Sequence, residues 1–209
     1  MLERFRTAWA RILGPAARGL NRLGVSPDVV TIVGTVGVMA GALVCFPQGW
    51  LWQGVLVVTA FVFADMLDGQ MAKISGRSSR WGAFLDSSLD RLGDAAVFGG
   101  LLLYLADARH DLVWAWMALA ALTLGQLTSY VKARAESLGF SCTGGLAARA
   151  DRLLVVLVAA FVAGLGVPYV LELAVTALAV AGLVTVVQRV LQVRRQAKAV
   201  LGPTPHVPG

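Results

Sequence analysis

The chain has 209 residues, of which 57% are hydrophobic and only 14% charged, and its mean hydropathy is +0.73. Soluble domains carry about 25% charged residues, so this composition argues against a soluble globular protein and indicates a membrane protein. The net charge of +6 comes with basic residues that flank apolar runs, which suits a membrane surface, and no nucleic-acid partner is expected.

Residues 1–27 are expected to form an amphipathic helix lying in the cytoplasmic membrane interface. Apolar residues recur there at helical spacing, and arginines gather on another face. The apolar set is Phe5, Trp9, Ile12, Ala16, Leu20 and Leu23, and the arginines are Arg4, Arg11, Arg18 and Arg22. Such a basic face attracts anionic lipid. The same arginines also fit an ordinary basic flank of the first span, and the two interpretations are compatible.

Six apolar segments follow, each near the roughly 20 residues needed to cross a bilayer. They are predicted at residues 28–46, 50–74, 82–107, 112–137, 150–166 and 169–193. Ser26 and Pro27 are expected as the N-cap and first residue of the first helix, and Gly37 and Gly41 suit a close helix contact. The predicted fold class is an all-α integral membrane protein, with a six-helix domain over residues 28–198 and a disordered cytoplasmic tail over residues 199–209.

Basic residues predict the orientation of these segments. Lys and Arg are frequent before the first segment, in the 74–81 and 138–149 loops and after the last segment, whereas the opposite loops contain only Arg109. By the positive-inside rule, both termini and these two loops face the cytoplasm. Cys45 and Cys142 then lie on opposite sides of the membrane, so no disulfide is expected between them.

Four carboxylates in apolar surroundings are the candidates for a metal site. Asp65 and Asp68 are three residues apart on one face of the second helix, and Asp86 and Asp90 are four apart on one face of the third. An ionised carboxylate in a membrane segment is costly, and four together repel one another unless cations lie between them. Oxygen ligands suit hard divalent ions, so the pattern predicts Mg²⁺ or Mn²⁺.

A fifth acid, Asp94, is interpreted as an intramembrane salt-bridge partner, for example of Arg91. A cation transporter is the rival class of function, because intramembrane acids also mark ion pathways. The paired acids lie near the predicted cytoplasmic ends of their helices rather than at the midplane, which favours an enzyme that takes a soluble substrate from one side. A structural membrane scaffold gives no reason for clustered acids.

One motif resembles a known family. The run Asp65-Met-Leu-Asp68-Gly69-Gln-Met-Ala72-Lys73, then eight residues, then Gly82, Asp86 and Asp90, resembles the CDP-alcohol phosphotransferase signature D-x-x-D-G-x-x-A-R, eight residues, G-x-x-x-D-x-x-x-D. Seven of its eight fixed positions match, and Lys73 replaces the family arginine. Segments starting at Ser26, Ser129 and Arg149 extend the resemblance over nearly the whole chain, most closely to bacterial members that make phosphatidylinositol phosphate.

This resemblance implies six transmembrane helices, a homodimer and an active site in a cytoplasm-facing cavity. Asp65, Asp68, Asp86 and Asp90 would bind two metal ions, Mg²⁺ or Mn²⁺, and Asp90 would also accept the proton. The positions matching family contacts to the CDP-lipid are Asp28, Val29, Val30, Thr31, Gly69, Lys73 and Ser79. Lysine keeps the charge of the family arginine but not its two-pronged contact with phosphate.

The implied reaction transfers the phosphatidyl group of CDP-diacylglycerol to inositol phosphate, giving phosphatidylinositol phosphate and CMP. Glycerol 3-phosphate is the alternative acceptor, because the metal motif does not distinguish acceptors. Lys132, Arg152 and Arg189 match basic positions of the resembling synthases and are expected to hold the acceptor phosphate. Arg134 and Arg149 are equally well explained by the orientation bias or by pairing with nearby acids.

Overall fold

The computed structural model describes residues 14–15, 17–75, 79–145 and 148–200, and within these ranges the chain forms helices and no strands. Each predicted apolar segment is occupied by a helix. These are α2 (Pro27–Cys45), α3 (Leu51–Ser75), α4 (Arg80–Leu103), α5 (Leu112–Ser137), α6 (Arg149–Gly164) and α7 (Val170–Val200), with a π-helical turn, η1 (Tyr104–Ala108), continuing α4. The predicted all-α class is confirmed.

Local capping sets where two of the helices begin. Ser26 caps α2, because its Oγ accepts a hydrogen bond from Val29 N at 3.3 Å, and Pro27 occupies the first helical position. Ser79 caps α4 in the same way, with its Oγ 2.9 Å from the donating Gly82 N. Both helices therefore begin after a serine whose hydroxyl caps the first turn.

The last helix is longer than the sequence predicted. An end at residue 193 was expected, but α7 continues to Val200. The added residues include Arg194, Arg195, Gln196 and Lys198, which are good helix formers, and no glycine or proline interrupts them before Gly202. Loss of hydrophobicity ended the predicted membrane segment there, but it does not end a helix.

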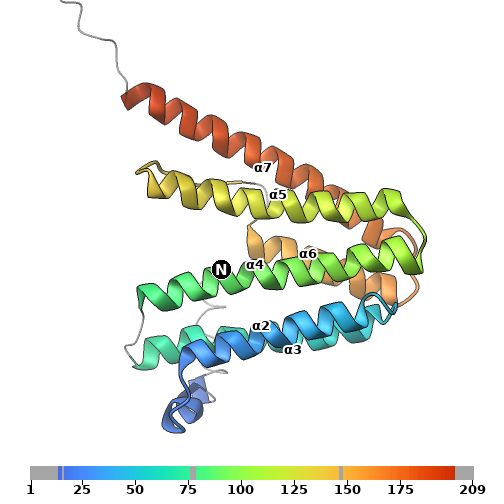
Figure 1. Cartoon of the computed structure of the whole chain (residues 1–209), viewed down its shortest axis with the longest axis horizontal. Coiled ribbons are helices and arrows are strands. Elements are labelled where there is room, and N and C mark those ends of the chain that lie inside the picture. The colour runs from blue at the N-terminus through green and yellow to red at the C-terminus, as the bar shows by residue number, and fades with distance from the viewer. Residues whose placement is uncertain (1–13, 16, 76–78, 146–147, 201–209) are drawn as a thin grey trace, which may run out of the picture.

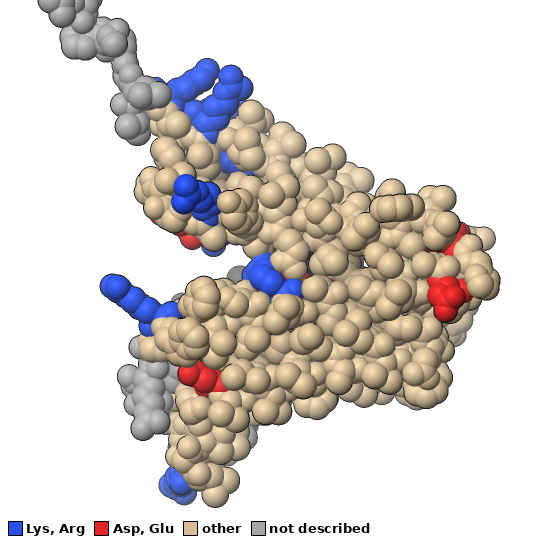
Figure 2. Space-filling model, in the orientation of Figure 1, with Lys and Arg blue, Asp and Glu red and all other residues tan. Residues whose placement is uncertain are grey.

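The helices run alongside one another in two groups (Figure 1). α2 packs against α3 and α4, and α5 packs against α7; α4 contacts α5, and α6 contacts both α3 and α7, so both α4 and α6 join the groups. Glycines allow the closest approach: a Cβ on Gly41 would lie 2.7 Å from Val57 Cγ1 of α3, and a Cβ on Gly37 would overlap the Phe61 ring. The surface is hollowed between the two groups, and Lys or Arg atoms lie at the inner end of the hollow (Figure 2).

Among the described residues, four helices are long and apolar enough to cross a membrane: α2, α3 over Leu51–Met71, α5, and α7 over Val170–Ala199. Their outer faces carry exposed apolar side chains, such as Val36 of α2 and Leu173 of α7, which suits contact with lipid. The chain is thus a multi-pass membrane protein. α4 carries several charged residues and α6 has only 16 residues, so α4 is too charged and α6 too short to be counted with these four helices.

The N-terminal amphipathic helix predicted over residues 1–27 falls largely outside the described residues. Residues 14–15 and 17–22 are helical, and Asn21 Nδ2 donates a hydrogen bond of 3.2 Å to Met71 O on α3. This contact attaches the end of the N-terminal segment to the end of α3 that carries the carboxylate motif. The tail beyond Val200 also lies outside the described residues.

Candidate active site

The two halves of the carboxylate motif lie on α3 and α4. Asp65 and Asp68 belong to the last turns of α3, and Asp86 and Asp90 to the first turns of α4. The side chains of Asp65, Asp68 and Lys73 lie outside the described part of the structure, so Asp86 and Asp90 carry the geometry. The Asp86 side chain is exposed and has no ion-pair partner among the described residues, whereas Asp90 is half-buried.

Asp90 lies where four helices meet. A small cavity of about 30 Å³ borders its side chain. The cavity is lined by Gly34, Thr35 and Val38 of α2, Val62 of α3, Leu89, Asp90 and Gly93 of α4, and Arg149 and Leu153 of α6. The Asp90 carboxylate thus borders a space between α2, α3, α4 and α6.

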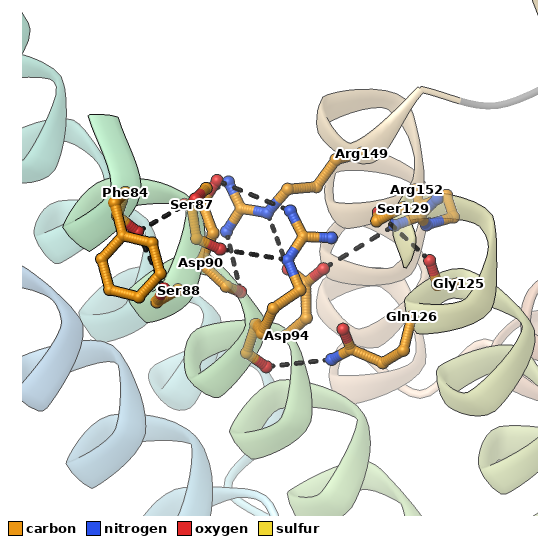
Figure 3. Close-up of polar contacts among 11 residues, drawn as sticks. Phe84, Ser87, Ser88, Asp90, Asp94, Gly125, Gln126, Ser129, Arg149 and Arg152 are labelled. Atoms are coloured by element: carbon orange, nitrogen blue, oxygen red, sulfur yellow. Dashed lines mark hydrogen bonds and ion pairs between the residues drawn. The ribbon is translucent and has the colours of Figure 1, made fainter. Parts of the chain in front are cut away.

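Arg149 joins α6 to the acidic face of α4 (Figure 3). Its Nη1 lies 2.8 Å from Asp90 Oδ1, and its Nε donates to Asp94 Oδ1 at 3.1 Å. Asp94 Oδ2 is also 3.7 Å from Arg152 Nη2. The salt bridge expected for Asp94 is therefore present, but Arg91 is not its partner: Arg91 Nε instead donates to Ser87 O one turn back on its own helix.

A second cavity of about 350 Å³ adjoins this network, and we call it the basic pocket. It lies between α4, α5, α6 and α7. The residues lining it are Arg91, Thr128, Ser129, Lys132, Ala133, Glu136, Ala148, Arg149, Arg152 and Arg189. The structure thus brings together all three residues predicted for the acceptor phosphate, and Arg149 borders both this pocket and the cavity beside Asp90.

Several buried donors of the basic pocket have no hydrogen-bond partner in the described part of the structure. They are Arg91 Nη1, Arg152 Nη2 and Thr128 Oγ1. Buried polar groups are normally satisfied, and leaving one unpaired costs about 1–3 kcal/mol. An anion in the pocket would supply the missing acceptors. Lys132 adds an ammonium that pairs only loosely with Glu136, at 3.8 Å and with both side chains about half exposed.

Arg189 differs from the other basic residues, because backbone carbonyls already occupy its donors. Its Nη1 donates to Thr128 O at 2.6 Å, and its Nε and Nη2 donate to Gly144 O at 3.2 and 3.0 Å. It lines the basic pocket while holding α7 to α5 and to the loop after α5. Its expected role as a phosphate ligand therefore stays a prediction, beside an observed structural role.

The residues expected to contact the CDP-lipid gather partly at the starts of α2 and α4. A Cβ on Gly82 would lie 3.3 Å from Ser79 Oγ and 3.8 Å from Asp28 Oδ1, which places these two predicted residues beside each other. The Ser79 hydroxyl is used as the N-cap of α4. No described atom lies within 4 Å of a Cβ built on Gly69, so the described structure leaves the α3 backbone open to a ligand there.

The other residues predicted to contact the CDP-lipid differ in how exposed they are. Val29 is exposed and Val30 half-buried, whereas Thr31 is buried and its Oγ1 donates to Pro27 O at 3.1 Å. Lys73, the departure from the family motif, has no described side chain. The structure therefore brings Asp28 and Ser79 together, and the role of the other residues in binding the CDP-lipid stays a prediction.

The donor set suits divalent metal ions. No cluster of three metal-ligating side chains occurs within the described residues, but the side chains of Asp65 and Asp68 are not among them. Asp86 offers an exposed carboxylate one turn from Asp90, and hard ions such as Mg²⁺ and Mn²⁺ prefer such oxygen ligands. Four aspartates at these helix positions fit a metal site of this kind.

Comparison with known proteins identifies the family. A family model described as CDP-alcohol phosphatidyltransferase matches residues 24–187. This chain belongs to that family. The chain is thus a metal-dependent transferase of phospholipid synthesis.

Its relatives within the CDP-alcohol phosphatidyltransferase family are closely similar. The phosphatidylinositol phosphate synthase of Cutibacterium acnes is 53% identical over 203 residues, covering 93% of this chain and 98% of that protein. That of Streptomyces avermitilis is 48% identical over 204 residues, covering 94% and 84%.

Solved structures of one family member share the fold. The Mycobacterium tuberculosis phosphatidylinositol phosphate synthase with CDP-DAG bound is 46% identical, has a TM-score of 0.85, and the match covers 88% of this chain and 94% of that one. The same enzyme in complex with manganese and citrate gives 45% identity and a TM-score of 0.84, with 87% and 88% covered.

Sequence reasoning did not single out Arg149 or Arg91 as residues of the site. Arg149 was as well explained by the positive-inside rule, and Arg91 was considered only as a partner for Asp94. The available signal for Arg149 was its place at the start of a segment that resembles the synthases. Only the tertiary structure puts its guanidinium between Asp90 and the basic pocket.

Proposed function

We propose that the chain is a phosphatidylinositol phosphate synthase, which transfers the phosphatidyl group of CDP-diacylglycerol to inositol phosphate and releases CMP. The observation that carries this proposal is the basic pocket, which Arg149 links to Asp90, with its buried donors that lack partners among the described residues. The names of the curated relatives and the CDP-DAG in one matching structure support it.

The reaction needs one bond to form and one to break at the donor's lipid-side phosphorus. The acceptor hydroxyl oxygen bonds to that phosphorus, the pyrophosphate bond to CMP breaks, and the hydroxyl proton is taken up by a base. Asp90 is the candidate base, because it borders the cavity where α2, α3, α4 and α6 meet. Arg149 holds one of its oxygens at 2.8 Å and so fixes the direction of the carboxylate.

Two divalent ions, Mg²⁺ or Mn²⁺, are proposed at Asp65, Asp68, Asp86 and Asp90. When bound, such ions neutralise the pyrophosphate and stabilise the leaving CMP oxygen. The manganese in the matching structure supports metal binding of this type. The donor's headgroup is proposed to lie against Asp28, Gly69 and Ser79, and Val29, Val30, Thr31 and Lys73 are proposed to contribute to the same site.

The acceptor's phosphate is proposed to lie in the basic pocket. Lys132 and Arg152 would bind it directly, because charge-assisted hydrogen bonds to phosphate are stronger than neutral ones. A dianion there also satisfies the buried donors of Arg91 and Thr128. Arg189 completes the wall of the pocket, and its proposed share in phosphate binding is additional to the carbonyl contacts it makes.

We propose in addition that α4 and α6 cross the membrane with the other four helices. Both lie alongside those helices in Figure 1, and in Figure 2 basic atoms gather toward one end of the visible surface, whereas acidic atoms appear at both ends. The basic end would face the cytoplasm with both termini and the active site. A homodimer, the N-terminal interfacial helix and the disordered tail remain proposals drawn from the sequence.

Purified protein tests the activity. CMP release from CDP-diacylglycerol would be measured with inositol phosphate, inositol or glycerol 3-phosphate, each with and without Mg²⁺ or Mn²⁺. We expect metal-dependent turnover with inositol phosphate and little with unphosphorylated inositol. Equal use of inositol would contradict a phosphate-binding pocket, and preferential use of glycerol 3-phosphate would assign the other acceptor. No CMP release with any acceptor would leave the transporter class in its place.

A further inference from the structure

In the connection between α5 and α6, residues 141–145 follow α7 and contact it at successive points. Gln196 holds Ser141 with three hydrogen bonds: its Oε1 accepts from Ser141 N at 2.9 Å and from Ser141 Oγ at 3.1 Å, and its Nε2 donates to Ser141 O at 2.6 Å. One amide side chain thus satisfies the backbone donor and acceptor of a loop residue 55 positions away.

The next two contacts between the loop and α7 lie closer to the basic pocket. Arg189 donates twice to Gly144 O, and Gly145 packs so tightly on α7 that a Cβ there would lie 2.5 Å from Thr185 Cγ2. Both glycines have positive φ angles, +91° and +128°, so the close course of the backbone needs residues without a Cβ.

The order of these contacts shows the direction of the loop. As the loop advances from residue 141 to residue 145, its partners on α7 recede from residue 196 to residue 185, a distance of about 16 Å along a helix. In Figure 1 the connection turns back after α5 in this way. It leads to Ala148, Arg149 and Arg152, which line the basic pocket at the start of α6.

We propose that Gln196 is a positioning residue for the acceptor: through Ser141 it holds the α5–α6 connection on α7 and so keeps Arg149 and Arg152 in place. This rests on the proposed function of the basic pocket. Gln196 and Ser141 do not line that pocket; they border a separate groove with Gln188, Leu191, Gln192 and Arg195. Gln196 therefore acts on the acceptor only through the loop.

The expected kinetic effect follows from a shift between loop conformations. When only a fraction of molecules holds the pocket in its binding arrangement, the apparent affinity falls by that fraction. In Gln196→Ala we expect the KM for inositol phosphate to rise about tenfold, the size of effect that corresponds to roughly 1.4 kcal/mol. The KM for CDP-diacylglycerol should change less than about twofold, because the donor residues lie on α2, α3 and α4.

Cys142 supplies a readout that does not depend on catalysis. Its side chain is only 1% exposed although it follows Ser141 in the loop, and the chain's other cysteine, Cys45, is replaceable by alanine to remove its signal. Release of the loop in Gln196→Ala should raise the labelling rate of Cys142 by a water-soluble maleimide at least severalfold. Ser141→Ala removes only the hydroxyl contact and keeps the two backbone contacts, so both effects should be smaller.

Gln192→Ala is the matched control. Gln192 lies one turn earlier on α7 and borders the same groove, but its side chain makes no hydrogen bond in the described part of the structure. It should match the parent protein in both measurements. If Gln196→Ala leaves Cys142 protected, or frees Cys142 without raising the acceptor KM, or weakens donor and acceptor equally, the positioning role is wrong. If the parent itself does not use inositol phosphate, the proposed function fails, while the labelling result still reports on the loop.

Discussion

Arg149 Nη1 lies 2.8 Å from Asp90 Oδ1, and the same guanidinium donates through Nε to Asp94 Oδ1 at 3.1 Å. One side chain from the start of α6 thus holds two carboxylates one turn apart on α4. Since it also borders the basic pocket, Arg149 connects the proposed base with the proposed acceptor site. An acceptor held in that pocket would lie against Arg149, whose guanidinium pairs with Asp90.

Arg149→Ala should lower kcat at least tenfold and reduce stability by about 1–3 kcal/mol, because Asp90 loses its orienting partner and Asp94 keeps only Arg152. Arg149→Lys should have a kcat and a stability between those of the parent protein and Arg149→Ala, since an ammonium cannot bridge two carboxylates with the geometry of a guanidinium. Turnover and the thermal midpoint in detergent measure the two effects. Arg134→Ala is the control, because Arg134 is exposed and its side chain hydrogen-bonds, within the described part of the chain, to Ser137 alone; normal turnover in Arg149→Ala would separate Arg149 from the chemistry.

Replacing the four motif aspartates should have two different effects, according to whether the residue is proposed to bind metal or to act as the base. Asp65→Ala, Asp68→Ala and Asp86→Ala should abolish metal-dependent turnover, because each is proposed to supply charge to the ions. Asp90→Asn should keep appreciable donor binding and lose turnover, as expected when a base is removed. Binding of CDP-diacylglycerol and CMP release, measured on the same preparations, distinguish these outcomes.

Asp94→Asn provides the contrast with that group. Asp94 is buried and pairs with Arg149 and Arg152, so its replacement should lower stability while leaving the metal requirement unchanged. Complete loss of activity in a folded Asp94→Asn protein would mean that this acid also belongs to the reacting site. Near-normal turnover in Asp90→Asn would remove the base role from Asp90.

Lys132→Ala and Arg152→Ala should each reduce acceptor kcat/KM by one to two orders of magnitude, the effect of losing about 1.5–3 kcal/mol in one charge-assisted contact. Donor affinity should stay nearly unchanged. Arg189→Ala should show the same loss together with faster labelling of Cys142, because Arg189 also holds the loop at Gly144. Loss of donor binding alone in these variants would contradict the pocket assignment.

Membrane orientation is open to labelling from outside the cell. In a background without Cys45 and Cys142, a cysteine introduced at position 110 should react with an impermeant reagent, and one at position 77 should be spared, because basic residues concentrate on the cytoplasmic side. The opposite pattern would invert the proposed topology.

Local signals in the sequence predicted much of this structure. The cap at Ser26, the helix segments and the placement of Asp86 and Asp90 on one face depend on neighbouring residues and helical periodicity, so they could be read in advance. The end of α7 was wrong by seven residues, from residue 193 to Val200, because the prediction followed hydrophobicity rather than helix propensity.

The contacts that assemble the site were beyond such reasoning. Arg149 and Arg189 look like ordinary cytoplasmic charges in the sequence, and nothing there tells that one reaches Asp90 and the other Gly144. Gln196 looks like a solvated residue after a membrane segment. These roles arise from packing between residues 45 to 59 positions apart, which no local pattern records.

A competition between acceptors tests the central claim most directly. Purified protein would receive CDP-diacylglycerol, a divalent metal ion, and equal concentrations of inositol phosphate and glycerol 3-phosphate, and the lipid products would be quantified by mass spectrometry. The account predicts that phosphatidylinositol phosphate forms in large excess over phosphatidylglycerophosphate, and that the two lipid products together equal the amount of CMP released. Predominant phosphatidylglycerophosphate, or phosphatidylinositol phosphate formed equally well without metal, would contradict it.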